Sequence, residues 1–326
     1  MDVFVTGSTG VLGSRLVSLL ADRGHDVAGL VRDDEGAARV EARGGTPAAG
    51  DVLEPATLTG AADADVVVHA ATAIPTSTRP TDEEWARNDR VRLEGARNLV
   101  DVAGEGADRF VFPSVVWVAR QPDGSAFDET ADRHPDRATR SAAGTEDLLL
   151  EAGETHGFEP TVLRLGFLYG PDAAHTRRWG RMLLEGRLPV VGGGLLGRRD
   201  AVFSLLHADD AGRALADAVE ADASGRYHVV DDEPVAVATV LQELADRLEA
   251  PSPRRVPAWL ARFFVGQVTA RTLSSPMPTT NERFAADAGW TPVYPTYRAG
   301  LRQVVETWLA EGTLRETADG LEWAAE

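Results

Sequence analysis

The chain has 326 residues, which is enough for one large domain or two modest ones with a substantial hydrophobic core. It carries 51 acidic and 33 basic residues, and the net charge of −18 favours a well-solvated surface and argues against a nucleic-acid partner. No apolar run approaches the length of a membrane span, and no basic leader precedes the first expected strand. We therefore expect a cytoplasmic protein without a membrane partner.

Missing residue types narrow the chemistry further. The sequence has no cysteine, which excludes disulfides, thiolate nucleophiles and cysteine metal ligands. Every one of the 33 basic residues is arginine, so a mechanism that needs a lysine amine cannot operate. The seven histidines are scattered without a His-x-x-x-His pair, and we expect no metal site. Asp209 and Asp210 look like a metal pair, but we interpret them as capping the following helix.

The first expected strand, turn and helix carry the strongest signal. An apolar run at 3–5 leads into a glycine-rich turn, and apolar residues then recur at helical spacing. Gly7 allows the tight turn, Gly10 lets the backbone approach a phosphate, and Gly13 lets helix and strand pack closely. Backbone N–H groups at such a helix start bind a pyrophosphate. The predicted dinucleotide site comprises Thr6, Gly7, Thr9, Gly10, Val11, Leu12 and Gly13.

The second strand, expected at 25–32, ends where a dinucleotide fold meets the adenosine ribose. An acidic residue at this end would hold the 2′-hydroxyl of NAD, but the chain has Val31 followed by Arg32. Because arginine fits a 2′-phosphate, we predict NADP as the cofactor. NAD is the alternative, with Arg32 solvated and Asp33 or Asp34 binding the ribose.

Two more strands complete the expected cofactor edge. The segment 44–52 ends in Asp51 and Val52, and the carboxylate can accept a hydrogen bond from the adenine amino group. The alternative for Asp51 is a helix N-cap, because Glu54 and a proline follow. The continuous apolar run at 65–71 is typical of a strand buried on both faces. It ends in His69, which we interpret as structural, and in two small residues that let the cofactor lie against the backbone, Ala70 and Ala71.

Alternating helices and strands continue along the chain, and become irregular beyond residue 171. This order predicts an α/β fold, a Rossmann-type doubly wound parallel sheet with a smaller, interleaved C-terminal cap. We assign 1–170 to the dinucleotide-binding domain, with 201–230 returning to it, and 171–200 and 231–326 to a substrate-binding cap. The other expected elements are helices at 83–103 and 141–152, strands at 109–117, 161–165, 203–207 and 227–230, and a flexible turn at Gly192–Gly194.

Taken together, these motifs resemble the extended short-chain dehydrogenase/reductase family, close to its NAD-dependent epimerase/dehydratase group. The resemblance covers nearly the whole chain and rests on segments 6–13, 50–52, 69–71, 164–171, 203–211 and 281–292. It implies a bound nicotinamide cofactor, hydride transfer, and a small-molecule substrate held by the cap. It also implies a homodimer formed through the helices around 83–103 and 141–152. His207 and Arg283 match family positions near the substrate.

The family's catalytic group is a serine with a Tyr-x-x-x-Lys pair, and this chain keeps only the serine. In that group tyrosine protonates the nascent alkoxide, and the lysine lowers the tyrosine pKa from about 10. The serine hydrogen-bonds the carbonyl oxygen. Ser114 matches the serine, but Ala138 stands where the tyrosine belongs and Ala142 where the lysine belongs. The chain is therefore an atypical member.

Three functions stay open at this point. The first is an NAD(P)-dependent oxidoreductase acting on a carbonyl or hydroxyl compound, with a non-standard proton donor. Candidates are Tyr169, which could instead be packing, His134, which could be a solvated loop residue, and water held by Ser114. The second is non-redox chemistry such as isomerisation or dehydration, and the third is an NADP-binding regulator without turnover. A cluster of cap arginines could bind an acidic substrate group: Arg177, Arg178, Arg181, Arg198 and Arg199.

Overall fold

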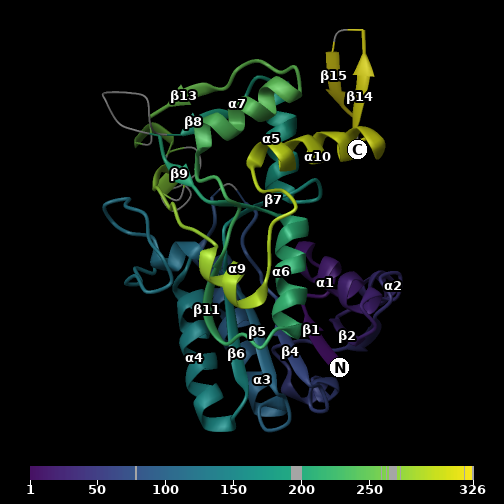
Figure 1. Cartoon of the computed structure of the whole chain (residues 1–326). Coiled ribbons are helices and arrows are strands. Elements are labelled where there is room, and N and C mark those ends of the chain that lie inside the picture. Colours follow the sequence, from purple (N-terminus) through teal and green to yellow (C-terminus); the bar gives the residue numbers. More distant parts are fainter. Residues whose placement is uncertain are drawn as a thin grey trace.

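In the described part of the chain, a parallel sheet of seven strands forms the centre of the structure, a computed structural model (Figure 1). The strand order is β11-β6-β5-β4-β1-β2-β3, which confirms the Rossmann-type doubly wound fold. All carboxyl ends therefore meet at one edge of the sheet. The strands are β1 (Asp2–Thr6), β2 (Asp26–Val31), β3 (Thr46–Ala49), β4 (Val66–His69), β5 (Arg109–Val115), β6 (Glu159–Leu165) and β11 (Gly225–Val229).

Two helical layers cover the two faces of this sheet. Helices α1 (Val11–Asp22) and α6 (Ala208–Glu220) pack together on one face, and α3 (Asp82–Ala103) and α4 (Arg140–His156) on the other. Alternate strand residues supply the two cores: Val111 packs on the α1 side, whereas Phe110 and Phe112 pack on the α3 side. This alternation decides which way every polar side chain on these strands points.

Shorter elements complete this half of the molecule. Helix α2 (Asp34–Glu41) packs against β3, and three short 3-10 helices follow strands, namely η1 (Pro55–Thr57), η2 (Thr59–Ala61) and η3 (Val116–Ala119). Helix α9 (Glu282–Ala288) brings a late segment of the chain back to β11. Its Phe284 joins the core on the α1 side together with Trp290.

The remaining elements lie beyond the carboxyl edge of the sheet (Figure 1). They share a second core that contains Phe203, Tyr297 and Trp308. Small sheets pair β7 (Phe167–Tyr169) with β10 (Leu205–His207), β8 (Pro189–Val191) with β13 (Arg254–Val256), β9 (Val202–Phe203) with β12 (Val235–Ala236), and β14 (Leu314–Thr317) with β15 (Gly320–Trp323). The helices are α5 (Ala174–Leu184), α7 (Val237–Arg247) and α10 (Tyr297–Ala310).

The structure describes residues 1–77, 79–191, 200–257, 259–261, 263, 270–271, 273–318 and 320–324. The expected turn at Gly192–Gly194 and the arginines Arg198 and Arg199 lie outside these residues. Within them, no helix combines the length and the apolar character needed to cross a bilayer.

Candidate nucleotide-binding site

The turn between β1 and α1 has a shape that only glycine permits. Gly7 adopts a left-handed φ of +68°, and a Cβ on it would lie 2.6 Å from the carbonyl oxygen of Ala70. A Cβ on Gly13 would lie 2.1 Å from the carbonyl oxygen of Gly7. Both glycines therefore let three backbone segments meet at the carboxyl edge without a side chain between them.

The same turn leaves the start of α1 open to an anion. Gly10 is the N-cap residue, no side chain caps the helix, and its first turn holds no acidic residue. The first helical hydrogen bond runs from the Ser14 N–H to the Gly10 carbonyl at 2.9 Å. The N–H groups of Val11, Leu12 and Gly13 therefore have no acceptor within the helix. Such donors, together with the positive end of the helix dipole, form a phosphate site.

Thr6 and His69 lie beneath the turn and hold it in place. The Thr6 Oγ1 lies 2.9 Å from Nδ1 of His69 and accepts a hydrogen bond from the Ala71 N–H at 3.2 Å. The other imidazole nitrogen, Nε2, lies 3.0 Å from the Arg92 carbonyl oxygen. Burial lowers the pKa of His69 to about 4, so its ring is neutral near pH 7. These contacts agree with the structural interpretation of His69.

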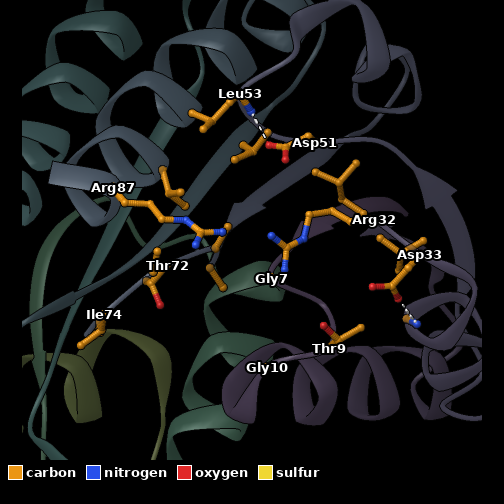
Figure 2. Close-up of a pocket in the computed structure, with 18 of the residues that line it drawn as sticks. Gly7, Thr9, Gly10, Arg32, Asp33, Asp51, Leu53, Thr72, Ile74 and Arg87 are labelled. Carbon is orange, nitrogen blue, oxygen red and sulfur yellow. Dashed lines mark hydrogen bonds between the residues drawn. The ribbon is translucent and has the colours of Figure 1, made fainter. Parts of the chain in front are cut away.

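A pocket of about 550 Å³ opens above the turn, at the carboxyl ends of β1, β2, β3 and β4 (Figure 2). Thr6, Val11, Leu12 and Gly13 do not line it: Thr6 is buried at the end of β1, and the other three form the first turn of α1. The structure does bring together at its wall the other predicted cofactor residues, Gly7, Thr9, Gly10, Arg32, Asp51, Val52, Ala70 and Ala71.

All three carboxylates in the pocket wall bind backbone N–H groups of their own segments. Asp33 caps α2 by accepting from the Gly36 N–H at 2.7 Å, which occupies one of the oxygens considered for the ribose of NAD. Asp51 accepts from the Leu53 N–H at 2.9 Å in a local turn rather than capping η1 (Figure 2). Glu84 accepts from the Thr81 N–H at 2.7 Å in a capping box.

The arginines of the pocket wall make fewer contacts with the protein than these carboxylates do. Arg32 and Arg87 point into the pocket (Figure 2), and neither forms an ion pair with any residue that the structure describes. Arg39, also in the wall, makes one long contact of 3.5 Å with exposed Glu35. The wall therefore offers unpaired positive charge to a ligand, as an anionic ligand requires.

Three charged wall residues, Arg39, Glu84 and Arg87, escaped the sequence analysis. Arg39 lies in α2, the helix that follows the second strand. Extending the search for cofactor residues along this helix would have found it. Glu84 and Arg87 come from the first turns of α3, and no motif marks them. The wall also includes the connection between β4 and α3, which the sequence did not identify: Thr72, Ala73, Ile74, Pro75 and Thr76.

Ser114 faces away from this pocket. It lies on the same side of β5 as Phe112, toward α3 and α4, and is 1% exposed. Its hydroxyl donates to Oε1 of Glu146 at 2.5 Å, and Glu146 also receives Nε and Nη2 of Arg164 at 3.0 and 2.7 Å. The serine hydroxyl is thus already engaged by a buried ion pair.

The two candidate proton donors also lie outside the pocket wall. Tyr169 is buried in the core beyond the sheet, where a Cβ on Gly300 would lie 2.0 Å from its hydroxyl oxygen. Burial raises the phenol pKa well above its ordinary value, and Asp231 and Asp210 raise it further, which weakens Tyr169 as a proton donor. His134 is exposed, and its backbone N–H donates to the Val118 carbonyl at 2.8 Å.

The positions of the missing pair are filled by other contacts. Ala142 is fully buried against Val118 and Ala143, so a lysine there would have no space for its chain. Ala138 lies just before α4, where its N–H donates to Oδ1 of Asp136 at 3.0 Å. The packing at position 142 is therefore built around a small residue, whereas the contact at position 138 is made by the backbone.

We expected Asp209 and Asp210 to cap the helix that follows them, but the structure corrects this expectation, because His207 is the N-cap residue of α6. Its Nδ1 accepts from the Asp209 N–H at 3.2 Å as the N-cap of α6, and its Nε2 lies 3.0 Å from Oε1 of Gln303. Asp209 instead bonds Nε of Arg15 at 2.6 Å, and Asp210 accepts two backbone N–H groups from residues 293 and 294. Burial lowers the pKa of His207 to about 4.

The arginines predicted on the substrate side pack on aromatic rings. Arg283 lies over the ring of Tyr227 at 4.9 Å, on the outer strand of the sheet. Arg177 and Arg181 both lie 5.6 Å from the ring of Trp323. These three arginines and His207 lie outside the wall of the nucleotide pocket.

Asp231, which follows β11, is a buried carboxyl with a consequence for pH dependence. It is 2% exposed, and burial together with Asp232 and Glu233 raises its pKa to about 8. The unfolded chain has a pKa near 3.9 for this group, so between these values only the folded protein holds the proton. We expect stability to fall as pH rises through this window, by up to about 1.4 kcal/mol per pH unit from this group.

Urea unfolding of wild type and Asp231→Asn between pH 5 and 8.5 measures this effect. The variant should lose the part of the pH dependence that Asp231 contributes, and exposed Asp63→Asn serves as a control that should keep it. Parallel profiles for wild type and Asp231→Asn would show that the carboxyl is not protonated in the folded protein.

The fold and the pocket define a class, namely an α/β protein with a Rossmann-type nucleotide site. Residues 3–230 match the NAD dependent epimerase/dehydratase family. The chain also resembles a Streptomyces protein, 3-diazoavenalumate denitrifying reductase, with 36% identity over 313 residues that cover 92% of this chain and 99% of the relative. This chain belongs to the NAD dependent epimerase/dehydratase family.

A second relative and two solved structures are also similar to this chain. A Stigmatella aurantiaca ketoreductase of 4-hydroxy-2-methyl-3-oxo-4-farnesyl-3,4-dihydroquinoline-1-oxide is 35% identical over 181 residues, 53% of this chain and 52% of the relative. UDP-glucose 4-epimerase of Thermotoga maritima has a TM-score of 0.75 at 20% identity, over 95% of this chain and 99% of its own. A human epimerase family protein with NADPH has a TM-score of 0.74 at 19% identity, over 94% and 99%. The two structures support the fold.

Proposed function

We propose that this protein is an NADP-dependent reductase of a small molecule. The observation that carries the proposal is the pocket itself, where an uncapped helix start and unpaired arginines face one cavity. Gly7 and Gly13 let the turn close tightly on itself, and Gly10 lines the pocket without a side chain, as a closely approaching pyrophosphate requires. When bound, a reduced nicotinamide supplies a hydride.

The chain's own residues have separate tasks in this proposal. The N–H groups of Val11 and Leu12 hold the pyrophosphate, and Arg32 and Arg39 hold the 2′-phosphate. Asp51 keeps its second carboxylate oxygen for the adenine amino group, because only the first receives the Leu53 N–H. Arg87, from α3, adds charge that does not depend on the 2′-phosphate.

The cofactor preference gives the first test of the proposal. Arg32→Ala should weaken NADP⁺ binding by about 10-fold or more, because a hydrogen bond to a charged group contributes about 1.5–3 kcal/mol. NAD⁺ lacks the phosphate, so its affinity should change little. Calorimetric titration of both nucleotides measures the difference, and Arg39→Ala should show the same selectivity.

Arg87→Ala is the matched control for that experiment. It removes an equally charged side chain from the same pocket, and we expect it to weaken NADP⁺ and NAD⁺ by similar factors. If wild type binds NAD⁺ as tightly as NADP⁺, or if Arg32→Ala weakens both equally, the assignment of Arg32 to the 2′-phosphate is wrong.

Proton supply is the second part of the proposal. Ser114 is engaged by Glu146, Tyr169 is buried with a raised pKa, and alanine stands at positions 138 and 142, so we infer that the protein supplies no acid of the usual kind. Water can then protonate the product, or the acceptor can be one that needs no such proton. The Streptomyces relative, by its name, removes nitrogen from a diazo compound. When hydride replaces departing dinitrogen, no alkoxide is left to protonate.

A turnover assay distinguishes this function from its alternative. The protein is mixed with NADPH and a panel of ketones and arenediazonium salts, and the absorbance of the reduced nicotinamide is followed. We expect consumption above the rate without protein. The alternative is an NADP-binding regulator, favoured by the engagement of Ser114 with Glu146 and the burial of Tyr169. Tight NADPH binding without consumption by any member of the panel would favour the regulator.

A further inference from the structure

Three aromatic side chains lie along the carboxyl edge of the sheet, beyond the nucleotide pocket. Trp117 belongs to η3, directly after β5, and Phe167 begins β7, directly after β6. Trp179 comes from α5, on the far side of the edge. The strand order places β5 next to β4, whose end already lines the nucleotide pocket, and β6 next to β5. In open α/β sheets ligands bind outside these strand ends.

The three rings form one stack, which we call the aromatic ladder. The ring centroids of Trp117 and Phe167 lie 5.7 Å apart at an interplanar angle of 27°, and those of Phe167 and Trp179 lie 5.6 Å apart at 8°. Each ring is partly exposed, whereas Phe203 behind Phe167 is fully buried. The ladder is therefore a stacked surface that rests on a packed core and keeps apolar area in contact with solvent.

One polar side chain that contacts the ladder is already engaged: the His175 ring lies 5.3 Å from the rings of Phe167 and Trp179, and its Nε2 lies 2.7 Å from the Leu168 carbonyl oxygen. Val115, at the end of β5, and Ala142 offer no hydrogen-bonding side chain, and they pack together. The indole Nε1–H of Trp117 is shielded from water and has no partner among the described residues. An unpaired buried donor is costly, so an acceptor atom on a bound molecule would satisfy it.

From this arrangement we infer that the aromatic ladder is the substrate platform, and that it takes a planar aromatic small molecule carrying a hydrogen-bond acceptor. A flat ring gains offset stacking on such a surface, whereas a sugar would leave its hydroxyl groups without partners. The platform continues the edge occupied by the nucleotide, which places the substrate beside the cofactor. The inference rests on the proposed reductase function only in taking the molecule in the neighbouring pocket to be a nicotinamide cofactor.

Binding of a planar acid and its saturated counterpart tests the inference without turnover. Calorimetry of the full-length protein with 2-naphthoate and with decahydro-2-naphthoate, each with and without NADP⁺, gives the affinities. We expect 2-naphthoate to bind several-fold more tightly than the saturated acid. Phe167→Leu and Trp117→Leu should weaken 2-naphthoate by about 3- to 10-fold, the size expected for loss of one aromatic pair. Trp117→Phe keeps an aromatic ring but lacks the Nε1–H donor, so it should weaken 2-naphthoate less than Trp117→Leu does.

Trp323→Leu is the matched control, because it removes a partly exposed tryptophan that contacts Trp308 and not the ladder. Its 2-naphthoate affinity should equal that of wild type, and NADP⁺ affinity together with the thermal midpoint of each variant confirms folding. Equal affinity for the flat and saturated acids, or equal affinity in Phe167→Leu and wild type, would overturn the inference. Failure of wild type to bind NADP⁺ while it still binds 2-naphthoate would overturn the proposed function alone.

Discussion

Gly13→Ala should abolish useful nucleotide binding, with an affinity for NADPH at least about 100-fold weaker, equal to the loss of two hydrogen bonds to charged phosphate oxygens. The added Cβ would lie 2.1 Å from the oxygen and 2.7 Å from the carbon of the Gly7 carbonyl group. Both contacts are to backbone, so the turn must move away from α1. The N–H groups that face the pocket then lose their common direction. Fluorescence titration with NADPH measures the loss.

Gly144→Ala is the control for a glycine-to-alanine change inside a helix. Gly144 lies in α4, and its nearest neighbour would be a Leu93 methyl at 3.6 Å from the new Cβ, an ordinary contact. The change should raise stability by up to about 1 kcal/mol, because alanine is the better helix former. NADPH affinity should stay at the wild-type value. If Gly13→Ala also binds NADPH like wild type, the close approach of α1 to the turn is not needed for binding.

The parts of the structure that the sequence predicts well depend on local rules. Val66, Val67 and Val68 form an uninterrupted apolar run because β4 is covered on both faces, so the strand is recognisable without any partner. Gly7 and Gly13 are recognisable because the turn between β1 and α1 leaves no room for a side chain. Arg32 can be predicted as a pocket residue because the glycine-rich turn after β1 fixes the place of β2 in the fold, and Arg32 follows the end of β2.

The parts that the sequence does not predict depend on where side chains point. Ser114 lies at the strand end that the family pattern indicates, but the two-residue alternation of β5 turns its hydroxyl toward Glu146. The imidazole of His207 could bind a polar group of a substrate. In the structure it instead caps α6 and contacts Gln303 from α10. The Ser114–Glu146 and His207–Gln303 contacts join residues 32 and 96 positions apart, so no local pattern reveals them.

A contact between α1 and the segment between β7 and α5 likewise cannot be predicted from the sequence. Arg15 of α1 reaches Asp172, which lies between β7 and α5, with two hydrogen bonds of 2.7 and 2.8 Å. The same guanidinium reaches Asp209 of α6. The helix whose start faces the pocket is thus joined directly to the segment between β7 and α5. One arginine side chain links this segment, α1 and α6.

Glu146→Ala should lower the free energy of unfolding by about 3–5 kcal/mol, the usual result of removing one partner of a buried ion pair. Glu146 and Arg164 are 0% and 1% exposed, and Arg133 and Arg226 each lie 3.4 Å from the Glu146 carboxylate. Without the carboxylate, the Arg164 guanidinium would remain buried without its counter-charge, and the Ser114 hydroxyl would lose its acceptor. Urea unfolding at pH 7 measures the loss.

The neighbouring residue on α4 supplies the control that separates burial from charge. Asp147 pairs with Arg133 at 2.7 Å, but its side chain is 54% exposed, so Asp147→Ala should cost no more than about 1 kcal/mol. Replacing both buried partners, in Glu146→Leu with Arg164→Met, should recover much of the stability, since no lone charge then remains buried. NADPH affinity should be retained in all three proteins, because the ion pair does not line the pocket. Equal losses for Glu146→Ala and Asp147→Ala would show that the buried pair is not the source of the stability.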